Sequence, residues 1–362
     1  MKHQQSKPKP EPDYWSRSAK RPGRKFCNYL IHHALAEQGE LWDGNRPIPV
    51  FRGRVASSVA KAIDTITAVI KSSEELFKVN TAGSRSSIHV SQLGREFIIC
   101  LNIDVNEATH HLQEHKFNPI WELFLNCSAK IGYVSTPLAA YRVAELNLVV
   151  DEIRRESKKK EFIRVLDNER RTMAKNRVKL VRDIARLRKR YRRIIAVRLD
   201  LLYRNDFDGY RGEFNGRKKD YDVIAKNRDA FLRYLRRGGF SHAFLWYAWK
   251  QEWGVEKGPH THVLIFFNGK KLRNDASVAY LMGRHWVDVI TNGEGVAFNC
   301  NARKSERYRQ VAIGKLQRND DTIYQALQDR VITYITKTDY YFRYEVPDGR
   351  RAFGRSSLPP GC

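Results

Sequence analysis

The chain has 362 residues, of which 66 are Lys or Arg and 40 are Asp or Glu, so its formal net charge is +26. No stretch approaches the roughly 18 apolar residues of a membrane span, and the N-terminal MKHQQSKPKPEPDYW lacks the apolar segment of a secretory signal. We therefore expect a soluble, cytoplasmic protein. The charge indicates a polyanionic partner, with nucleic acid as the first candidate and an acidic membrane surface as the second.

The five cysteines are spaced singly, without a CxxC pair for zinc and without the dense, even spacing of a disulfide framework. We expect reduced thiols at all five positions, which are Cys27, Cys100, Cys127, Cys300 and Cys362.

Residues 1–24 are rich in proline and charge, which is typical of a disordered basic arm. Residues 25–150 are predicted to form an N-terminal domain, to which the sequence assigns no role. Helical spacing is present in KFCNYLIHHALAEQG, SSVAKAIDTITAVIKSSEELFK and THHLQEHKFNPIWELFLNC, whereas REFIICLNIDV (95–105) is typical of a strand.

Residues 144–191 predict one or two long basic helices, and we expect residues 151–192 to be a basic helical linker. Residues 151–193 contain 18 Lys or Arg and 7 Asp or Glu, which indicates a phosphate-binding surface or, more simply, a solvated helix face. The apolar positions fit one stripe beneath this basic face, and they are Ile163, Leu166, Met173, Leu180, Ile184 and Leu187.

Residues 193–358 predict an α+β domain. RIIAVRLDLLY (193–203), SHAFLWYAWKQEW and KGPHTHVLIFFNG are typical of strands, and a helix is expected over about 221–236. These elements are followed by a short helix near SVAYLMGR, a strand at HWVDVIT, a turn at NGEG and the run VAFNCNA. A final helix is expected over about 320–337, with Asp320 or Asp321 as its N-cap. Short connections that contain glycine favour antiparallel pairing, with helices packed on one face of the sheet.

His260 and His262 lie one residue apart at the start of an apolar strand. Side chains alternate along a strand, so both imidazoles share one face, with Cα atoms about 6.6 Å apart, and they can converge on one divalent cation. A pair of hydrogen-bonded histidines is the simpler alternative.

The preceding strand offers a third ligand through a short hairpin. If residues 255–259 form a five-residue loop, Gly254 faces His260, and Glu252 faces His262 on the ligand face. A six-residue loop presents Gln251 instead. An anionic oxygen suits a hard cation better than an amide does, which favours Glu252, although a surface carboxylate beside Lys250 is also consistent with the sequence.

The final helix contains Tyr334 and Lys337, three residues apart and therefore on adjoining positions of one face. Tyr334 falls at the inner edge of the apolar stripe, so a purely structural role is also open. A neutral phenol, with an ordinary pKa near 10, is a poor nucleophile that a base or a nearby cation would activate.

Taken in order, the strand RLDL, the HxH strand and the YxxK helix resemble the three motifs of HUH-type rolling-circle replication initiators. Five segments resemble the C-terminal domain of prophage and inovirus-type replication proteins, the YagK/YfjJ family. They are YRRIIAVRLDLLY, WKQEWGVEKGPHTH, ITNGEGVAFNCNA, YITKTDYYFR and RAFGRSS. The resemblance covers roughly residues 176–358.

This resemblance implies an HUH-endonuclease-like antiparallel sheet with flanking helices, preceded by a mainly helical basic N-terminal region. The implied activity is a metal-dependent nickase that cuts and rejoins single-stranded or extruded DNA through a 5′-phosphotyrosine intermediate, in rolling-circle replication of a phage, prophage or plasmid. The roles carried over by position are His260, His262 and Glu252 as metal ligands, Tyr334 as nucleophile and Lys337 as its helper. Tyr340 or Tyr341 is open as a second nucleophile.

Mg²⁺ or Mn²⁺ is favoured over zinc because phosphate oxygens complete a harder site. The basic helix and the N-terminal arm are expected to hold flanking DNA phosphates. The candidate DNA contacts are Arg188, Lys189, Arg190, Arg192, Arg193 and Arg198. Host helicase and polymerase are further candidate partners, and Trp246, Trp249 and Trp253 are candidates for stacking on bases or for the core.

One residue departs from the wider HUH class, because Thr261 stands where a bulky hydrophobic residue is usual between the histidines. This departure favours, mildly, an alternative function: a non-catalytic DNA-binding regulatory or architectural protein with a decayed nuclease site. An RNA-binding protein would share the charge but would give no reason for HxH, Glu252 and YxxK to occur together.

Overall fold

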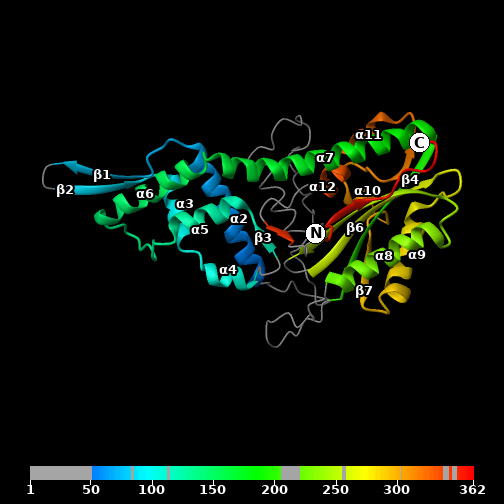
Figure 1. Cartoon of the computed structure of the whole chain (residues 1–362), viewed down its shortest axis with the longest axis horizontal. Helices are drawn as coiled ribbons and strands as arrows, with labels where there is room; N and C mark the ends of the chain where they lie inside the picture. The colour runs from blue at the N-terminus through cyan, green and yellow to red at the C-terminus, as the bar shows by residue number, and fades with distance from the viewer. Residues whose placement is uncertain are drawn as a thin grey trace, which may run out of the picture. The chain divides into compact units, whose positions relative to one another are not determined.

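The computed structural model describes residues 51–82, 85–111, 115–204, 221–254, 258–302, 304–336, 342–344 and 349–362 (Figure 1). The predicted arm and the helix expected near residues 25–39 lie outside these ranges. Among the helices that are described, none is long and apolar enough to cross a bilayer. The four cysteines in these ranges, Cys100, Cys127, Cys300 and Cys362, are free thiols.

The first half of the described chain is mainly helical, as the sequence predicted. Its buried residues form one apolar core that includes Ile63, Phe97 and Trp121. The elements are α2 (Phe51–Lys71), β1 (Phe77–Ala82), β2 (Arg85–Val90), α3 (Gln92–Leu101), α4 (Val105–His111), β3 (His115–Phe117), α5 (Pro119–Ser128) and α6 (Ala140–Glu156).

The strand predicted for residues 95–105 is wrong, because α3 occupies most of this segment. Ser91 caps the helix by accepting a hydrogen bond from the Gly94 N–H at 3.0 Å. Phe97 and Ile98 are buried while Ile99 is 68% exposed, which fits a helical face and not the alternation of a strand. Tertiary packing of this face outweighs the strand preference of the isoleucines.

The basic segment forms two helices, α6 and α7 (Lys160–Arg190), with a break at residues 157–159. The predicted apolar stripe is present at its C-terminal end, where Leu180, Ile184 and Leu187 are buried. At the other end Ile163 is 45% exposed. Only the last turns of α7 therefore pack against the sheet that follows.

The second half contains one antiparallel six-stranded sheet in the order β10-β5-β6-β4-β7, with β8 also paired to β4. The predicted strand at residues 193–203 and the helix near 221–236 are confirmed. The elements are β4 (Arg193–Tyr203), α8 (Tyr221–Arg237), β5 (Phe244–Gly254), β6 (Gly258–Asn268), α9 (Asp275–His285), β7 (Gly295–Asn299), α10 (Lys304–Arg307), β8 (Gly314–Gln317) and β10 (Phe353–Arg355). A short β9 (Phe342–Tyr344) pairs with β3.

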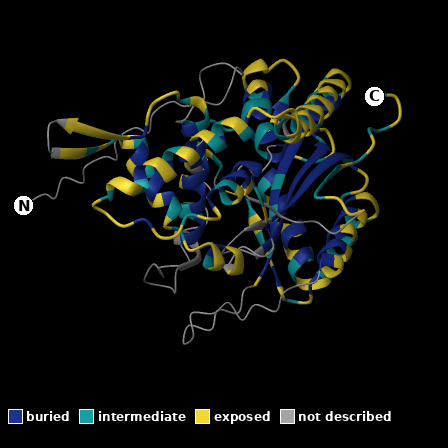
Figure 2. Ribbon diagram, turned by 60° about the vertical axis from the view of Figure 1, so that its left-hand side comes forward, coloured by how far each residue is buried: buried dark blue, intermediate teal, exposed yellow. Residues whose placement is uncertain are grey.

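Helices cover both faces of this sheet, which corrects the expectation that they pack on one face (Figures 1 and 2). Even-numbered positions such as Leu264 and Phe266 join α7 and the final helix in one core. Odd-numbered positions such as Val263 and Ile265 join α8 and α9 in the other. The strand alternation predicted for residues 260–267 is therefore confirmed, and two apolar faces follow from the near-continuous apolar runs of β4 and β6.

The strand predicted at HWVDVIT is also wrong, because the chain continues from α9 into a π-helical turn, η1 (Trp286–Ile290). Trp286 is buried, and its indole N–H donates to the Leu202 carbonyl at 3.1 Å. Val289 is 66% exposed. Anchoring of the indole outweighs the strand preference of the valines and isoleucine around it.

The final helix forms as predicted and begins at Asp320, whose carboxylate accepts from the Ile323 N–H at 3.0 Å. It comprises α11 (Asp321–Ala326), a π-helical segment η2 (Leu327–Ile332) and α12 (Thr333–Thr336). The wider π turns rotate the positions that follow relative to a regular helix, and such turns are frequent at functional sites. Tyr334 comes directly after η2.

Candidate active site

The β5–β6 hairpin brings Glu252 opposite His260. Gly254 pairs with Gly258, so the connection has three residues and not the five or six expected, and Lys250 pairs with His262. This register differs by two residues from the expected one, and a shift of two keeps every side chain on its face. Glu252 therefore still lies on the same face as both histidines.

Gln251, the other candidate for the third ligand, lies on the opposite face. Its side-chain amide donates to the His260 carbonyl at 2.9 Å and accepts from the Thr261 hydroxyl at 2.6 Å. Thr261 thus has a buried partner away from the ligands, and its departure from the usual residue type leaves the histidine face unchanged.

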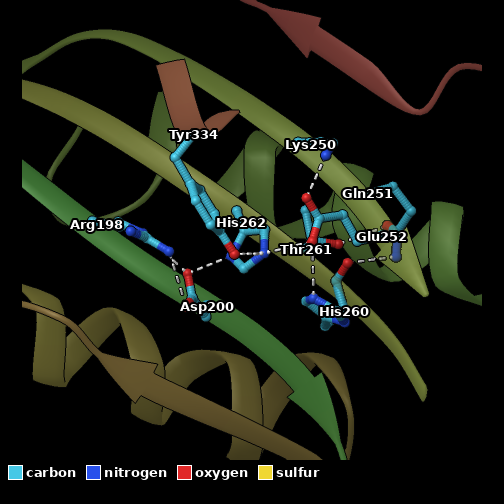
Figure 3. Close-up of polar contacts among 9 residues, drawn as sticks. All are labelled: Arg198, Asp200, Lys250, Gln251, Glu252, His260, Thr261, His262 and Tyr334. Atoms are coloured by element: carbon cyan, nitrogen blue, oxygen red, sulfur yellow. Dashed lines mark hydrogen bonds and ion pairs between the residues drawn. The ribbon is translucent and has the colours of Figure 1, made fainter. Parts of the chain in front are cut away.

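Glu252, His260 and His262 form a buried cluster, which we call the candidate metal centre (Figure 3). Oε2 of Glu252 lies 3.1 Å from Nε2 of His262 and 3.4 Å from Nε2 of His260. One ligand atom from each residue lies within 4.8 Å of the others. Two ligands that hold one ion at about 2.1 Å lie about 3.0 Å apart in octahedral and about 3.4 Å apart in tetrahedral geometry. The donor set therefore fits a divalent cation.

Asp200 on β4 orients His262, a role that the sequence reasoning missed although it quoted RLDL. Asp200 pairs with His262 across the strands, and its Oδ1 lies 2.7 Å from Nδ1 of the imidazole. A carboxylate on the far nitrogen of a histidine fixes the ring and directs Nε2 towards a metal. The signal was available, because Arg198 and Asp200 interrupt an apolar strand at alternate positions.

The electrostatics of the cluster depend on its two carboxylates. Burial alone would lower the pKa of the His262 imidazole, but Asp200 and Glu252 outweigh burial and raise this pKa to about 9. Burial would raise the pKa of both carboxyl groups, yet Arg198 and His262 hold the pKa of Asp200 below its ordinary value. Lys250 and His262 likewise hold the pKa of Glu252 well below its ordinary value. Both carboxylates are therefore ionised near neutral pH.

Lys250 is a buried partner of Glu252, with its ammonium group in an ion pair with Oε1. The sequence left open, as an alternative to a ligand role for Glu252, a surface carboxylate beside this lysine. The structure buries both residues instead, and the lysine balances the charge of the carboxylate.

Tyr334 lies beside the candidate metal centre, as the sequence predicted for a nucleophile. Its hydroxyl oxygen is 3.2 Å from Nε2 of His262, and the two rings meet nearly edge to face at 5.1 Å between centroids. The Arg198 guanidinium lies 4.6 Å from the centre of the Tyr334 ring and 3.4 Å from the carboxylate of Asp200. A cation in this position stabilises negative charge on the phenol.

Asn301, which the sequence reasoning did not single out, fixes the backbone at Arg198. β4 pairs with β8 at residues 193–196 and with β7 at residues 199–203, which leaves a gap between the two partners. The Asn301 amide oxygen accepts from the Arg198 N–H at 2.9 Å, and its amide nitrogen donates to the Ala196 carbonyl at 2.9 Å. The side chain thus completes the strand edge directly beside the cluster.

The candidate DNA contacts divide into two groups. Arg198 is 11% exposed within the site, whereas Arg193 begins β4 about 23 Å from Asp200, at a rise of about 3.3 Å per residue, and residues 188–192 precede that strand. Arg188 donates to the Arg318 carbonyl at 2.7 Å and pairs with Asp321, and Arg190 donates to the Pro360 carbonyl. Lys189 and Arg192 are exposed, and Arg193 is half-buried.

Three predicted residues lie outside the described ranges, namely Lys337, Tyr340 and Tyr341.

Two of the three candidate tryptophans, Trp246 and Trp249, are buried in the cores on the two faces of the sheet. Their role is therefore structural, and any stacking on bases must come from other side chains.

The fold and the site define an α+β domain with an antiparallel sheet that carries a buried Glu/His/His cluster and an adjacent tyrosine. The family model of the YagK/YfjJ C-terminal domain matches residues 172–356. The chain therefore belongs to this family. Comparison with curated proteins and with solved structures gave no match.

Proposed function

We propose that the C-terminal domain is an HUH-type nickase that cuts and rejoins one strand of DNA, and that it initiates rolling-circle replication of a phage, prophage or plasmid. The observation that carries the proposal is the distance of 3.2 Å between the Tyr334 hydroxyl and His262 of the candidate metal centre. Membership of the family, the antiparallel sheet and the net charge of +26 support it.

In the proposed reaction the Tyr334 oxygen attacks the scissile phosphorus, and the bond from phosphorus to the 3′ oxygen breaks. The phenolic proton passes to solvent, and the departing 3′ oxygen takes up a proton, so that the strand ends in a free 3′-OH and a 5′-phosphotyrosine link. Because a phosphodiester is exchanged for another, the link conserves the energy for rejoining. Arg198 stabilises the charge on the attacking phenol.

His260, His262 and Glu252 would hold a divalent cation, with Mg²⁺ or Mn²⁺ proposed. When bound, such an ion polarises the scissile phosphate and stabilises the charge that develops on its oxygens. Asp200 keeps the Nδ1–H of His262 engaged, so that Nε2 is presented to the site.

A covalent-trapping experiment tests the proposal. The full chain is incubated with single-stranded DNA from the element that encodes it, with Mn²⁺ or with EDTA, and resolved on a denaturing gel. The wild type should form a covalent adduct with the DNA in the presence of Mn²⁺ but not in EDTA. Tyr334→Phe should bind the same DNA without forming an adduct. Tyr280→Phe, which changes an exposed tyrosine on α9, is the matched control and should behave as wild type.

An undiminished adduct with Tyr334→Phe would remove this residue from the role of nucleophile. DNA binding that depends on salt, with no cleavage under any metal, would instead identify the alternative: a DNA-binding regulator with an inactive site.

A further inference from the structure

Strand β4 has a gap along one edge, directly at Arg198. Among the strands that the structure describes, β8 pairs with residues 193–196 of β4 and β7 pairs with residues 199–203. Residues 197 and 198 lie between these two ladders. Backbone groups of a buried strand need hydrogen-bond partners, so another part of the chain must bind them at this point.

The segment that follows β7 fills the gap. The Asn301 side chain bridges the Arg198 N–H and the Ala196 carbonyl, each at 2.9 Å. The Cys300 N–H donates to the Arg198 carbonyl at 3.3 Å. Two consecutive residues therefore hold both backbone groups of Arg198, in place of a neighbouring strand.

Asp275, at the start of α9, determines which way the Asn301 amide points. Its carboxylate accepts a second hydrogen bond from the amide nitrogen of Asn301 at 2.6 Å, and both side chains are buried. A reversed amide would place its oxygen against this carboxylate and its nitrogen against the Arg198 N–H. Polar groups left unpaired at a buried position are costly, so Asp275 selects the orientation that accepts from Arg198.

An ion pair supports Asp275 in turn. The ammonium group of Lys304 on α10 pairs with the carboxylate and balances its charge. Gly314, which pairs with Ala196 at the end of β8, borders this pair: a Cβ atom there would lie 2.8 Å from the lysine nitrogen and 3.1 Å from the carboxylate oxygen. The φ of +96° at this position also favours glycine. We call Asn301, Asp275 and Lys304 the β4 lock.

The β4 lock acts on the residue that faces the proposed nucleophile. The Arg198 guanidinium lies 4.6 Å from the centre of the Tyr334 ring and 3.4 Å from the carboxylate of Asp200 (Figure 3). A side chain keeps such a position only while its own backbone is fixed. A displacement of about 1 Å at a reacting group can lower a rate about 100-fold, so the lock bears on the reaction and not on the sheet alone.

We propose that Asp275 and Asn301 are positioning residues of the reaction. Asp275 holds the Asn301 amide, and Asn301 holds the backbone of Arg198 so that the guanidinium stays over the Tyr334 ring. Both residues act on the reaction through Arg198. This inference rests on the proposed function, and it differs from a purely structural role, which would affect stability and leave the rate unchanged.

Single-turnover kinetics separate positioning from stability. An excess of the full chain is mixed with Mn²⁺ and the end-labelled DNA of the trapping experiment, and the rate constant and final yield of adduct are measured. Asn301→Ala should lower the rate constant about 10- to 100-fold, with the yield and the affinity for DNA unchanged. Asp275→Ala should lower it about tenfold, and Asp275→Asn, whose amide oxygen can still accept from Asn301, should restore part of the rate.

Asn102→Ala is the matched control. The Asn102 side chain makes the same two kinds of backbone hydrogen bond, both with Val134 at 2.9 Å, in the first half of the chain. This variant should react at the wild-type rate. In an Arg198→Met background, Asn301→Ala should cause no further loss of rate, because the two changes act through one side chain.

A second measurement needs neither DNA nor metal. The aromatic ring shields protons that lie over its face, so the Nε–H of Arg198 should give an NMR signal at an unusually low chemical shift, identified by its loss in Arg198→Met. Asn301→Ala and Asp275→Ala should move this signal towards the range of solvated arginines. Asn102→Ala should leave it in place.

These measurements distinguish the failure of this proposal from that of the nickase proposal. An unmoved Arg198 signal, a loss of yield at an unchanged rate constant, or an additive loss in the Arg198→Met background would overturn the role of the lock. If wild type forms no adduct but Asn301→Ala moves the signal, nicking is excluded while the lock stands as the device that positions Arg198. If wild type forms the adduct and the signal stays, nicking stands and the lock is structural only.

Discussion

The two faces of the central sheet are built from the same strands but serve different purposes. On the odd-numbered face, Leu199, Leu201, Val263 and Ile265 are buried, and the apolar core continues along the strands. On the even-numbered face, His262 lies two positions before the buried Leu264. A period of two thus lets one strand supply core on one side and reactive groups on the other, without any loop.

The largest effect is expected from removing the reactive groups of the even-numbered face. His260→Ala with His262→Ala should lower metal-dependent adduct formation about 1,000-fold or more, because the two imidazoles are both nitrogen ligands of the proposed cation, which would stabilise charge on the phosphate. Quantitative denaturing gels with Mn²⁺ measure the rate. Full cleavage by the double variant would show that the histidines of the even-numbered face are not needed for the reaction.

The apolar part of the even-numbered face should behave as ordinary core. Leu264→Ala and Ile265→Ala remove buried side chains from opposite faces, and each should lower the free energy of unfolding by about 2–5 kcal/mol. Urea unfolding measures both. Metal stoichiometry, determined by calorimetry below the unfolding transition, should stay unchanged, and loss of metal in Leu264→Ala alone would extend the site into the core.

Asp200→Asn tests the orientation of His262 without removing a ligand. An amide does not hold the Nδ1–H as a carboxylate does, so the affinity for Mn²⁺ should fall about 10- to 100-fold. Isothermal titration calorimetry measures the affinity. Asp222→Asn, which makes the same chemical change at an exposed ion pair with Arg350, should leave it unaltered.

The raised pKa of His262 predicts how metal affinity depends on pH. The imidazole is protonated below about pH 9 in the metal-free fold, and a cation must displace this proton from Nε2. Affinity for Mn²⁺ should therefore rise about tenfold per pH unit from pH 6.5 and level off near pH 9. An affinity that is independent of pH over this range would show that His262 is not a ligand.

The raised pKa of His262 also predicts that the stability of the metal-free protein falls as the pH rises, in contrast to the metal affinity. Because the pKa of His262 is raised from its ordinary 6.5, the protonated form stabilises the fold fully below about pH 6.5, and this stabilisation is lost as the pH rises through about 9. Urea unfolding in EDTA across this range should show the decline, and His262→Gln should flatten it.

The smallest effect is expected at the residue between the histidines. Thr261→Val removes the hydrogen bond to Gln251 on the odd-numbered face and should lower the free energy of unfolding by about 1 kcal/mol. Metal affinity should not change, since the ligand face is untouched. A large loss of metal in this variant would contradict the separation of the two faces.

The sequence predicted most of the sheet and the residues at its centre. The alternation of RIIAVRLDLLY and of the HxH strand defined the strands, whereas the role of Tyr334 beside the ligands came from the resemblance to the HUH motifs and not from the spacing of YxxK. The segments at 95–105 and 285–291 were assigned to strands because β-branched residues favour strands locally, whereas the Ser91 cap and burial of Trp286 decide the structure. Such packing is not encoded in a short window of sequence.

The candidate site was predicted in composition but not in detail. The hairpin register could not be read from the sequence, since both strands are apolar on both faces and give no local preference for one pairing. Asp200, Arg198 and Lys250 act through partners on other strands, so their roles depend on contacts that only the folded chain brings together.

The register of the β5–β6 hairpin also constrains how this family can diverge. Because Glu252 is held on the ligand face by the pairing of β5 and β6, the connection between the strands can change in length while the carboxylate remains available. A slip of the pairing itself by one residue would present Gln251 instead, and would separate it from Thr261. Homologues that keep the centre are therefore expected to keep this pairing.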